Sequence, residues 1–247
     1  MKSIFLGIVQ GLTEFLPISS SGHLYLIKNI LNINEDYFSF FVFLHIPTLI
    51  AVLFFFSKEI KFLKDLRLVA HIIFICVITG IIGFGINLCF RSTFGNSYFL
   101  SFCFFVNALI LFNTKGNITK RNWKDLNLKD SFLIGLLQGL APLPGISRSG
   151  ITIAILLRRG FSKNDSFMLS FLIAIPLMVG VFIFDLRYFM AGSFWAFSAI
   201  ISFIFAFLSG ILALGVLKRV IIMEKVSKFA YYCLFLSLFS LLMGLIK

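Results

Sequence analysis

The sequence predicts an all-α polytopic membrane protein with an inverted-topology repeat, in which each half consists of a re-entrant helical hairpin and three transmembrane helices. Three observations support this prediction: an apolar composition, a motif that occurs twice, and basic residues that gather in a few short segments. Residues 1–247 are expected to form a single membrane domain. Its parts are repeat one at about 1–114, a linker at about 115–130 and repeat two at about 131–247.

The composition excludes several classes of protein. Hydrophobic residues make up 60% of the 247 positions and charged residues 13%, which is too apolar for an ordinary soluble protein. The net charge of +12 does not indicate a nucleic-acid partner, because the basic residues lie in short loops between apolar segments. The four cysteines form no CxxC pair, so neither a disulfide framework nor a metal cluster is expected.

The repeated motif occupies residues 7–23 and, with an offset of 128, residues 135–151. Eight positions are identical in the two copies: Gly7, Gln10, Gly11, Leu12, Ile18, Ser19, Ser21 and Gly22 recur as Gly135, Gln138, Gly139, Leu140, Ile146, Ser147, Ser149 and Gly150. In each copy an apolar run is interrupted by Pro, Gly and Ser. Because broken helices are tolerated at membrane depth only inside protein or beside water, each copy is expected to be a hairpin of two half-helices. The shared glycines are expected to allow close helix packing.

Six other segments are apolar and long enough to cross a bilayer core of about 30 Å. These predicted spans are residues 38–56, 68–90, 96–112, 166–186, 194–217 and 229–246. Three spans therefore follow each copy of the motif.

The basic residues predict the orientation of the spans, because short cytoplasmic loops are enriched in Lys and Arg. Sixteen of the 22 basic residues lie in the loops that follow the first, third and fifth spans and the second hairpin. These loops should therefore lie on the cytoplasmic side of the inner or plasma membrane. This assignment requires both hairpins to return to the side from which they enter. Since three is an odd number, the second half is inverted and the two hairpins meet near the midplane.

Glu14 and Gln10 are four residues apart and so project from one face of the first half-helix. An ionised carboxylate within the membrane costs about 2.5 kcal/mol or more, and such groups are functional candidates by default. The alternative is a residue near the interface that reaches water. His45, before Pro47 in the first span, could line the same pocket or serve packing.

Arg148 is the strongest candidate in the second motif. A guanidinium stays protonated and matches phosphate or carboxylate with two hydrogen bonds. We expect Arg148 to bind phosphate, helped by the hydroxyls of Ser147, Ser149 and Thr152 and by the start of the half-helix; it could also pair with Glu14.

In the first motif, the serine run that starts at Ser19 precedes His23. It could be a helix N-cap, an anion site with a titratable donor, or both.

Two segments carry a resemblance to a known family: QGLTEFLPISSSGH at 10–23 and PGISRSG at 144–150. Together they resemble the two signatures of the undecaprenyl-pyrophosphate phosphatase family of the bacitracin-resistance type, and the similarity continues through 165–176. The resemblance implies hydrolysis of undecaprenyl (polyprenyl) pyrophosphate to the monophosphate and inorganic phosphate. This recycles the lipid carrier for cell-wall peptidoglycan synthesis and confers bacitracin resistance. It also implies a divalent cation and an active site open to the outer side. The implied site residues are Glu14, Ser20, His23, Ser147, Arg148 and Thr152.

In this hypothesis Arg148 and the second half-helix, with Ser147, Ser149, Thr152 and Ser19, bind phosphate. Glu14, helped by Gln10, binds Mg²⁺ or Ca²⁺, because hard cations prefer oxygen ligands. Gln10 is the uncharged form of a position that carries Glu or Gln in the family. His23 acts as general acid or base or as the nucleophile, with Ser20 and water as competing nucleophiles.

Two other functions fit parts of the sequence. A polyprenyl-phosphate flippase or secondary transporter would share the inverted repeat, with Glu14 and Arg148 as a gating pair. A phosphatase of the type-2 phosphatidic acid phosphatase group is disfavoured, because no His-Asp partner follows Arg148. Prenyl chain length and a homodimeric state are left open.

Overall fold

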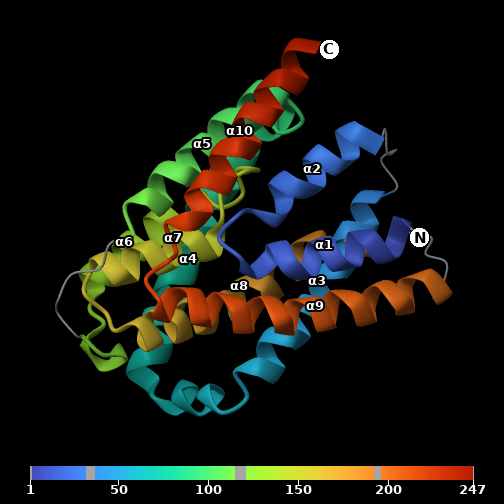
Figure 1. The fold of residues 1–247 in the computed structure, drawn as a ribbon. Coiled ribbons are helices and arrows are strands. Elements are labelled where there is room, and N and C mark those ends of the chain that lie inside the picture. Colours follow the sequence, from blue (N-terminus) through green and yellow to red (C-terminus); the bar gives the residue numbers. More distant parts are fainter. Residues whose placement is uncertain (1, 32–36, 115–120, 192–195, 247) are drawn as a thin grey trace.

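The computed structural model describes residues 2–31, 37–114, 121–191 and 196–246, and its regular structure there is helical apart from one isolated bridge (Figure 1). The α-helices are α1 (Lys2–Phe15), α2 (Ser20–Leu31), α3 (Tyr37–Phe55), α4 (Leu66–Phe90), α5 (Ser97–Phe112), α6 (Leu128–Gln138), α7 (Arg148–Arg158), α8 (Lys163–Ala191), α9 (Ala196–Ile222) and α10 (Lys228–Ile246). Short 3₁₀-helices are η1 (Glu59–Lys64), η2 (Arg91–Thr93) and η3 (Trp123–Asp125). The predicted all-α class is confirmed.

The six predicted spans correspond to α3, α4, α5, α8, α9 and α10. Among the described residues α4, α8, α9 and α10 are long and apolar enough to cross a membrane, whereas α3 and α5 are shorter apolar helices. The protein is therefore a multi-pass membrane protein. Residues 194–195 of the fifth predicted span and 115–120 of the expected linker lie outside the described residues. Helix α6 begins at Leu128, so the last residues of that linker are already helical.

Both copies of the motif break as predicted. Helix α1 ends at Phe15 and α2 begins at Ser20, while α6 ends at Gln138 and α7 begins at Arg148. The second loop includes Gly145 at φ +104°, a conformation that glycine adopts without steric cost. Each motif is thus a helix, a loop and a second helix.

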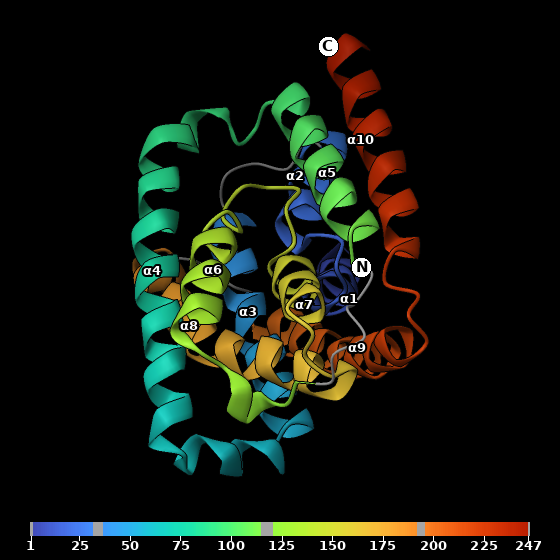
Figure 2. The same ribbon diagram turned by 90° about the vertical axis from the view of Figure 1, so that its left-hand side faces the viewer.

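The two halves exchange helix contacts (Figures 1 and 2). Helix α1 of the first motif packs along α9 of the second half, and its counterpart α6 packs along α4 of the first half. Helix α5 packs along α10, and α3 along α8. Each half therefore supplies the packing partner for the other half's motif.

Glycines allow these exchanged contacts. A Cβ atom at Gly7 would lie 2.5 Å from the Ser202 carbonyl oxygen of α9, and one at Gly139 would lie 2.5 Å from Cβ of Ile82 in α4. Both distances are too short for non-bonded atoms. The expectation that the repeated glycines permit close helix packing is confirmed.

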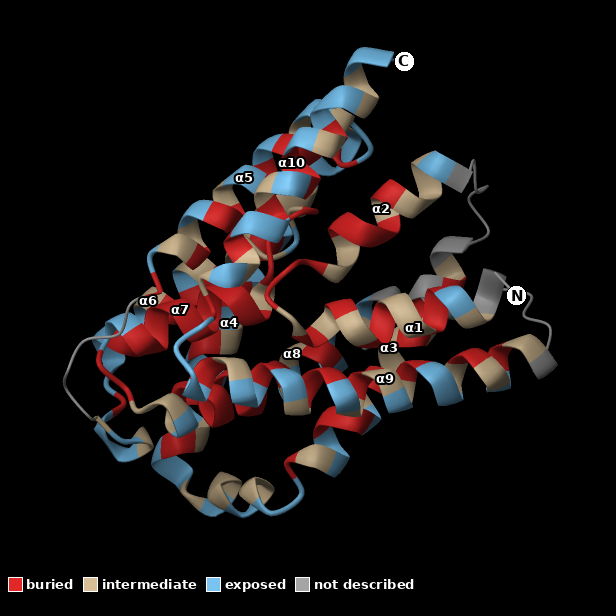
Figure 3. Cartoon of the chain, in the orientation of Figure 1, coloured by how far each residue is buried: buried red, intermediate tan, exposed pale blue. Residues whose placement is uncertain are grey.

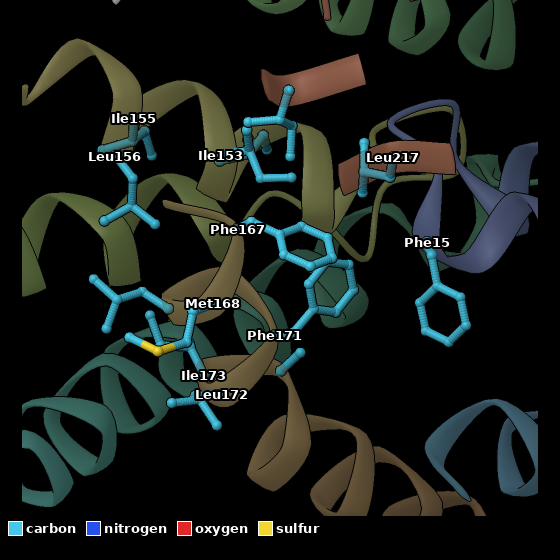
Figure 4. Close-up of a cluster of buried hydrophobic side chains, with 14 of the residues drawn as sticks. Phe15, Ile153, Ile155, Leu156, Phe167, Met168, Phe171, Leu172, Ile173 and Leu217 are labelled. Atoms are coloured by element: carbon cyan, nitrogen blue, oxygen red, sulfur yellow. The ribbon is translucent and has the colours of Figure 1, made fainter. Parts of the chain in front are cut away.

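Helices α7 and α8 contribute many side chains to the largest buried core cluster, among them Leu156, Phe167 and Phe171 (Figure 4). The outer faces of α9 and α10 are exposed (Figure 3), although they carry large apolar side chains. Leu212 is 60% exposed and Phe235 is 62% exposed. Such extensive exposed apolar surface is expected where helices contact lipid.

A buried carboxylate fixes the start of α6. Asp130 is fully buried and accepts hydrogen bonds from Arg121 and from Nε of Arg159, the latter at 2.6 Å. Burial by itself raises the pKa of Asp130, but the two guanidinium groups outweigh it and hold the pKa below its usual value. Asp130 therefore ties the segment before α6 to the end of α7.

We expect Gly7→Ala to destabilise the protein by about 1–3 kcal/mol, because the added methyl group must displace the α9 backbone. Gly80→Ala is the matched control, since a Cβ there meets no atom within 4 Å and alanine favours helix. Thermal unfolding in detergent measures both. Equal melting temperatures for the two variants would contradict the close contact of α1 with α9.

Asp130→Asn should lower stability at pH 7 by about 1.5–3 kcal/mol, because the partly exposed Arg121 and Arg159 lose a buried, charged hydrogen-bond acceptor. The folded pKa of Asp130 lies below the unfolded value, so its stabilisation is present above about pH 4 and lost as the pH falls through the folded pKa. Thermal melts from pH 7 to pH 3 should show the gap between wild type and variant shrinking in acid. A gap that stays constant would contradict the role of this charge.

Candidate active site

An ion pair joins the two motifs. Nη2 of Arg148, at the start of α7, lies 3.3 Å from Oε1 of Glu14, in the last turn of α1. The side chains are only 9% and 15% exposed for Glu14 and Arg148. A buried charge is stable only when it is paired, so each residue accounts for the burial of the other. The pairing that the sequence left as an alternative is present.

Three further side chains lie close to the second carboxylate oxygen of Glu14. Oε2 accepts hydrogen bonds from Ser20 Oγ at 2.7 Å and from Gln10 Nε2 at 3.1 Å. Nε2 of His45 lies 3.9 Å away. Gln10 and Glu14 share one face, as predicted. His45 therefore lies beside the Glu14 carboxylate, and its role in the site stays a prediction.

Two buried polar atoms at this site lack a hydrogen-bond partner among the described residues. They are Nη1 of Arg148 and Oε1 of Gln10. An unsatisfied buried polar group costs about 1–3 kcal/mol, so such atoms commonly face a ligand. The guanidinium nitrogen is a donor for an anion, and the amide oxygen is an acceptor for a cation or a donor group.

The donor atoms fit a hard divalent cation. The carboxylate of Glu14 and Oε1 of Gln10 are oxygen ligands of the kind that Mg²⁺ and Ca²⁺ prefer. In the described part of the chain, no three His, Cys, Asp or Glu residues gather closely enough to hold a metal. A cation here would need further ligands from substrate oxygens or water.

The serine hydroxyls mainly hold the two loops together. Oγ of Ser19, whose φ is 68°, accepts a hydrogen bond from the Gly145 backbone N–H of the other motif at 3.0 Å. Ser147 caps α7 by accepting from Gly150 N–H at 3.2 Å. The hydroxyls of Ser147 and Ser149 both reach the Leu16 carbonyl at 3.4 Å. Binding of phosphate by these three serines stays a prediction.

Thr152 also forms hydrogen bonds that stabilise the local structure of the second motif. Its Oγ1 donates to the Arg148 carbonyl at 2.7 Å, one helical turn earlier, and lies 2.9 Å from Oε1 of Gln138. Such back-bonding within a helix is common for Thr. Thr152 therefore contacts the backbone of Arg148 rather than its guanidinium, and phosphate binding by its hydroxyl stays a prediction.

His23 is bound on both ring nitrogens. Nδ1 lies 2.7 Å from the Ser19 carbonyl, which can only accept, so the neutral ring carries its proton on Nδ1. Nε2 then accepts from the Tyr232 hydroxyl at 2.8 Å, and the two rings stack at 5.7 Å. Within the described residues His23 forms no hydrogen bond with Glu14 or Arg148. The partner Tyr232, on α10, was missed because no motif marks it.

Asn107 of α5 was also missed. Its Nδ2 donates to the Pro17 carbonyl at 3.0 Å, and its Oδ1 accepts from the Ser147 backbone N–H at 3.0 Å. The side chain thus contacts both motif loops. The signal available in the sequence was an amide in the middle of an otherwise mostly apolar predicted span.

The chain is similar to a known family over nearly its whole length. Residues 3–239 match the family described as Bacitracin resistance protein BacA. A protein of Thermosipho africanus named undecaprenyl-diphosphatase is 39% identical, over 99% of this chain and 100% of its own length. Proteins with the same name from Thermotoga maritima and Methanococcus vannielii are 38% and 36% identical, over 98% and 97% of this chain and 99% and 98% of their own lengths.

Proposed function

Because the chain belongs to the bacitracin resistance protein BacA family, we propose that it hydrolyses undecaprenyl diphosphate to undecaprenyl phosphate and inorganic phosphate. This reaction regenerates the lipid carrier for peptidoglycan synthesis and so confers bacitracin resistance. The observation that carries the assignment is the buried Glu14–Arg148 pair, in which Nη1 of Arg148 is left for an anion. Relatives named for this activity match nearly the whole chain.

The substrate's charge explains why an arginine lies at this depth. A diphosphate monoester carries about two to three negative charges, and catalysis of phosphoryl transfer consists mainly of positioning the phosphoryl group and stabilising its charge. Arg148 can exchange part of its contact with Glu14 for phosphate oxygens, using the fork geometry of the guanidinium. The first turn of α7 adds backbone N–H groups at the same end.

The geometry favours Ser20 as the nucleophile and Glu14 as its base. Oγ of Ser20 already donates to Glu14 at 2.7 Å, so the carboxylate takes the hydroxyl proton as Oγ attacks the terminal phosphorus. The bond from phosphorus to the bridging oxygen breaks, and undecaprenyl phosphate leaves. Water then attacks the phosphoserine, Ser20 recovers its proton from Glu14, and the proton of the water leaves with phosphate. His23 as nucleophile is the alternative, and it would first have to release Tyr232.

A divalent cation, Mg²⁺ or Ca²⁺, is proposed at Glu14 and Gln10. The support is chemical: a carboxylate beside a buried amide oxygen that has no partner among the described residues. When bound, the cation supplies positive charge to the phosphate oxygens.

The chain is proposed to be an inverted repeat, with this site inside the membrane. The exchanged packing of α1 with α9 and of α6 with α4 supports two halves with re-entrant hairpins. The gathering of basic residues at one set of loops supports an orientation with those loops on the cytoplasmic side of the cell membrane. A site open to the outer side stays a prediction. A homodimer stays a prediction.

Phosphate release from undecaprenyl diphosphate by the purified protein in detergent tests the function, since a flippase or transporter would release none. Arg148→Lys should lower kcat/KM about 100-fold, because a point charge cannot reproduce the two-pronged contact of the guanidinium. Arg158→Lys, on the exposed end of the same helix, is the control and should stay within about twofold. Near-normal turnover by Arg148→Lys would remove Arg148 from the phosphate site.

Gln10→Glu should lower the Mg²⁺ concentration needed for half-maximal activity about tenfold, because a second carboxylate joins Glu14. Chelator should abolish phosphate release by wild type and variant alike. A metal titration of initial rates measures the change. An unchanged half-activating concentration would show that position 10 does not contact the cation.

A further inference from the structure

We propose that Asn107 is a positioning residue that holds the two motif loops in register, so that Arg148 faces Glu14. The inference rests on the proposed phosphatase function. It concerns a helix outside both motifs, α5, and a side chain that need not touch the substrate.

Both polar atoms of the Asn107 side-chain amide form hydrogen bonds. The residue has no exposed surface. Nδ2 donates to the Pro17 carbonyl in the loop between α1 and α2, and also lies 3.2 Å from Sγ of Cys233. Oδ1 accepts from the N–H of Ser147, the N-cap residue of α7. Only a side chain that both donates and accepts can satisfy these two backbone groups together.

These two backbone groups lie next to the charged residues. Pro17 follows Glu14 by three residues, and Ser147 directly precedes Arg148. A shift of either loop therefore moves one member of the ion pair relative to the other. Because a misplacement of about 1 Å can cost about 100-fold in rate, a fixed loop register is a catalytic requirement.

Packing and hydrogen bonds to α10 hold helix α5, and with it Asn107, in place. It packs along α10, where the Ser101 hydroxyl donates to the Ser237 carbonyl at 2.7 Å and the Ser240 hydroxyl donates to the Ser97 carbonyl at 2.9 Å. Ser101 is buried on the same helix as Asn107, yet its partners lie on α10 and not in a motif loop. It therefore offers a matched control for a lost buried hydrogen bond.

The experiment compares Asn107→Ala with Ser101→Ala by phosphate release and by thermal unfolding. Both variants lose buried hydrogen bonds, so both melting temperatures should fall. Only Asn107→Ala should lose kcat, by about 100-fold, whereas Ser101→Ala should stay within about threefold. Asn107→Asp keeps an acceptor for the Ser147 N–H but can donate to the Pro17 carbonyl only when it is protonated, so its kcat should fall between those of Asn107→Ala and Ser101→Ala. It also supplies a testable variant if the alanine variant does not fold.

A double variant separates positioning from general destabilisation. In the Arg148→Lys background, Asn107→Ala should lower kcat less than about threefold, because the contact that it positions is already impaired. Two changes that multiply fully would overturn the proposal. So would equal kcat values for Asn107→Ala and Ser101→Ala while wild type is active. Absence of phosphate release by wild type would instead overturn the proposed function.

Discussion

The ion pair between Glu14 and Arg148 is the interaction on which the site depends. Each residue comes from a different half of the chain, and each would be an uncompensated charge in apolar surroundings without the other. The pair is also incomplete, because Nη1 of Arg148 has no partner in the described part of the chain. The same contact that makes the charges tolerable thus leaves capacity for an anionic ligand.

The neighbouring hydroxyl and amide groups stabilise the two motif loops. Ser19, Ser147 and Asn107 bind backbone groups of the two loops, and they are buried. Because these neutral groups fix the loops, the charged side chains do not have to. A frame of hydrogen bonds and a separate charged centre is the arrangement that preorganised electrostatic catalysis requires.

The sequence predicted this centre better than it predicted its surroundings. The repeat and the cost of charge in a membrane identified Glu14 and Arg148, because residue chemistry alone marks such positions. The sequence could not show where the His45 side chain lies, since the rotation of one span against another depends on packing. Asn107 and Tyr232 were missed for a related reason: they lie in predicted spans outside the motifs, and only the pairing of α5 with α10 brings them near the loops. The helices themselves were predictable because long apolar runs permit little else.

The exchange of helix partners has a consequence for how such a chain could arise. A single half would present its motif helix with a glycine-lined face but without the helix against which that face packs. Two copies of one half could satisfy each other by swapping these faces, as in a domain-swapped dimer. Fusion of the two copies would then free each motif to diverge. One could keep a carboxylate and the other acquire a guanidinium, which identical subunits could never do.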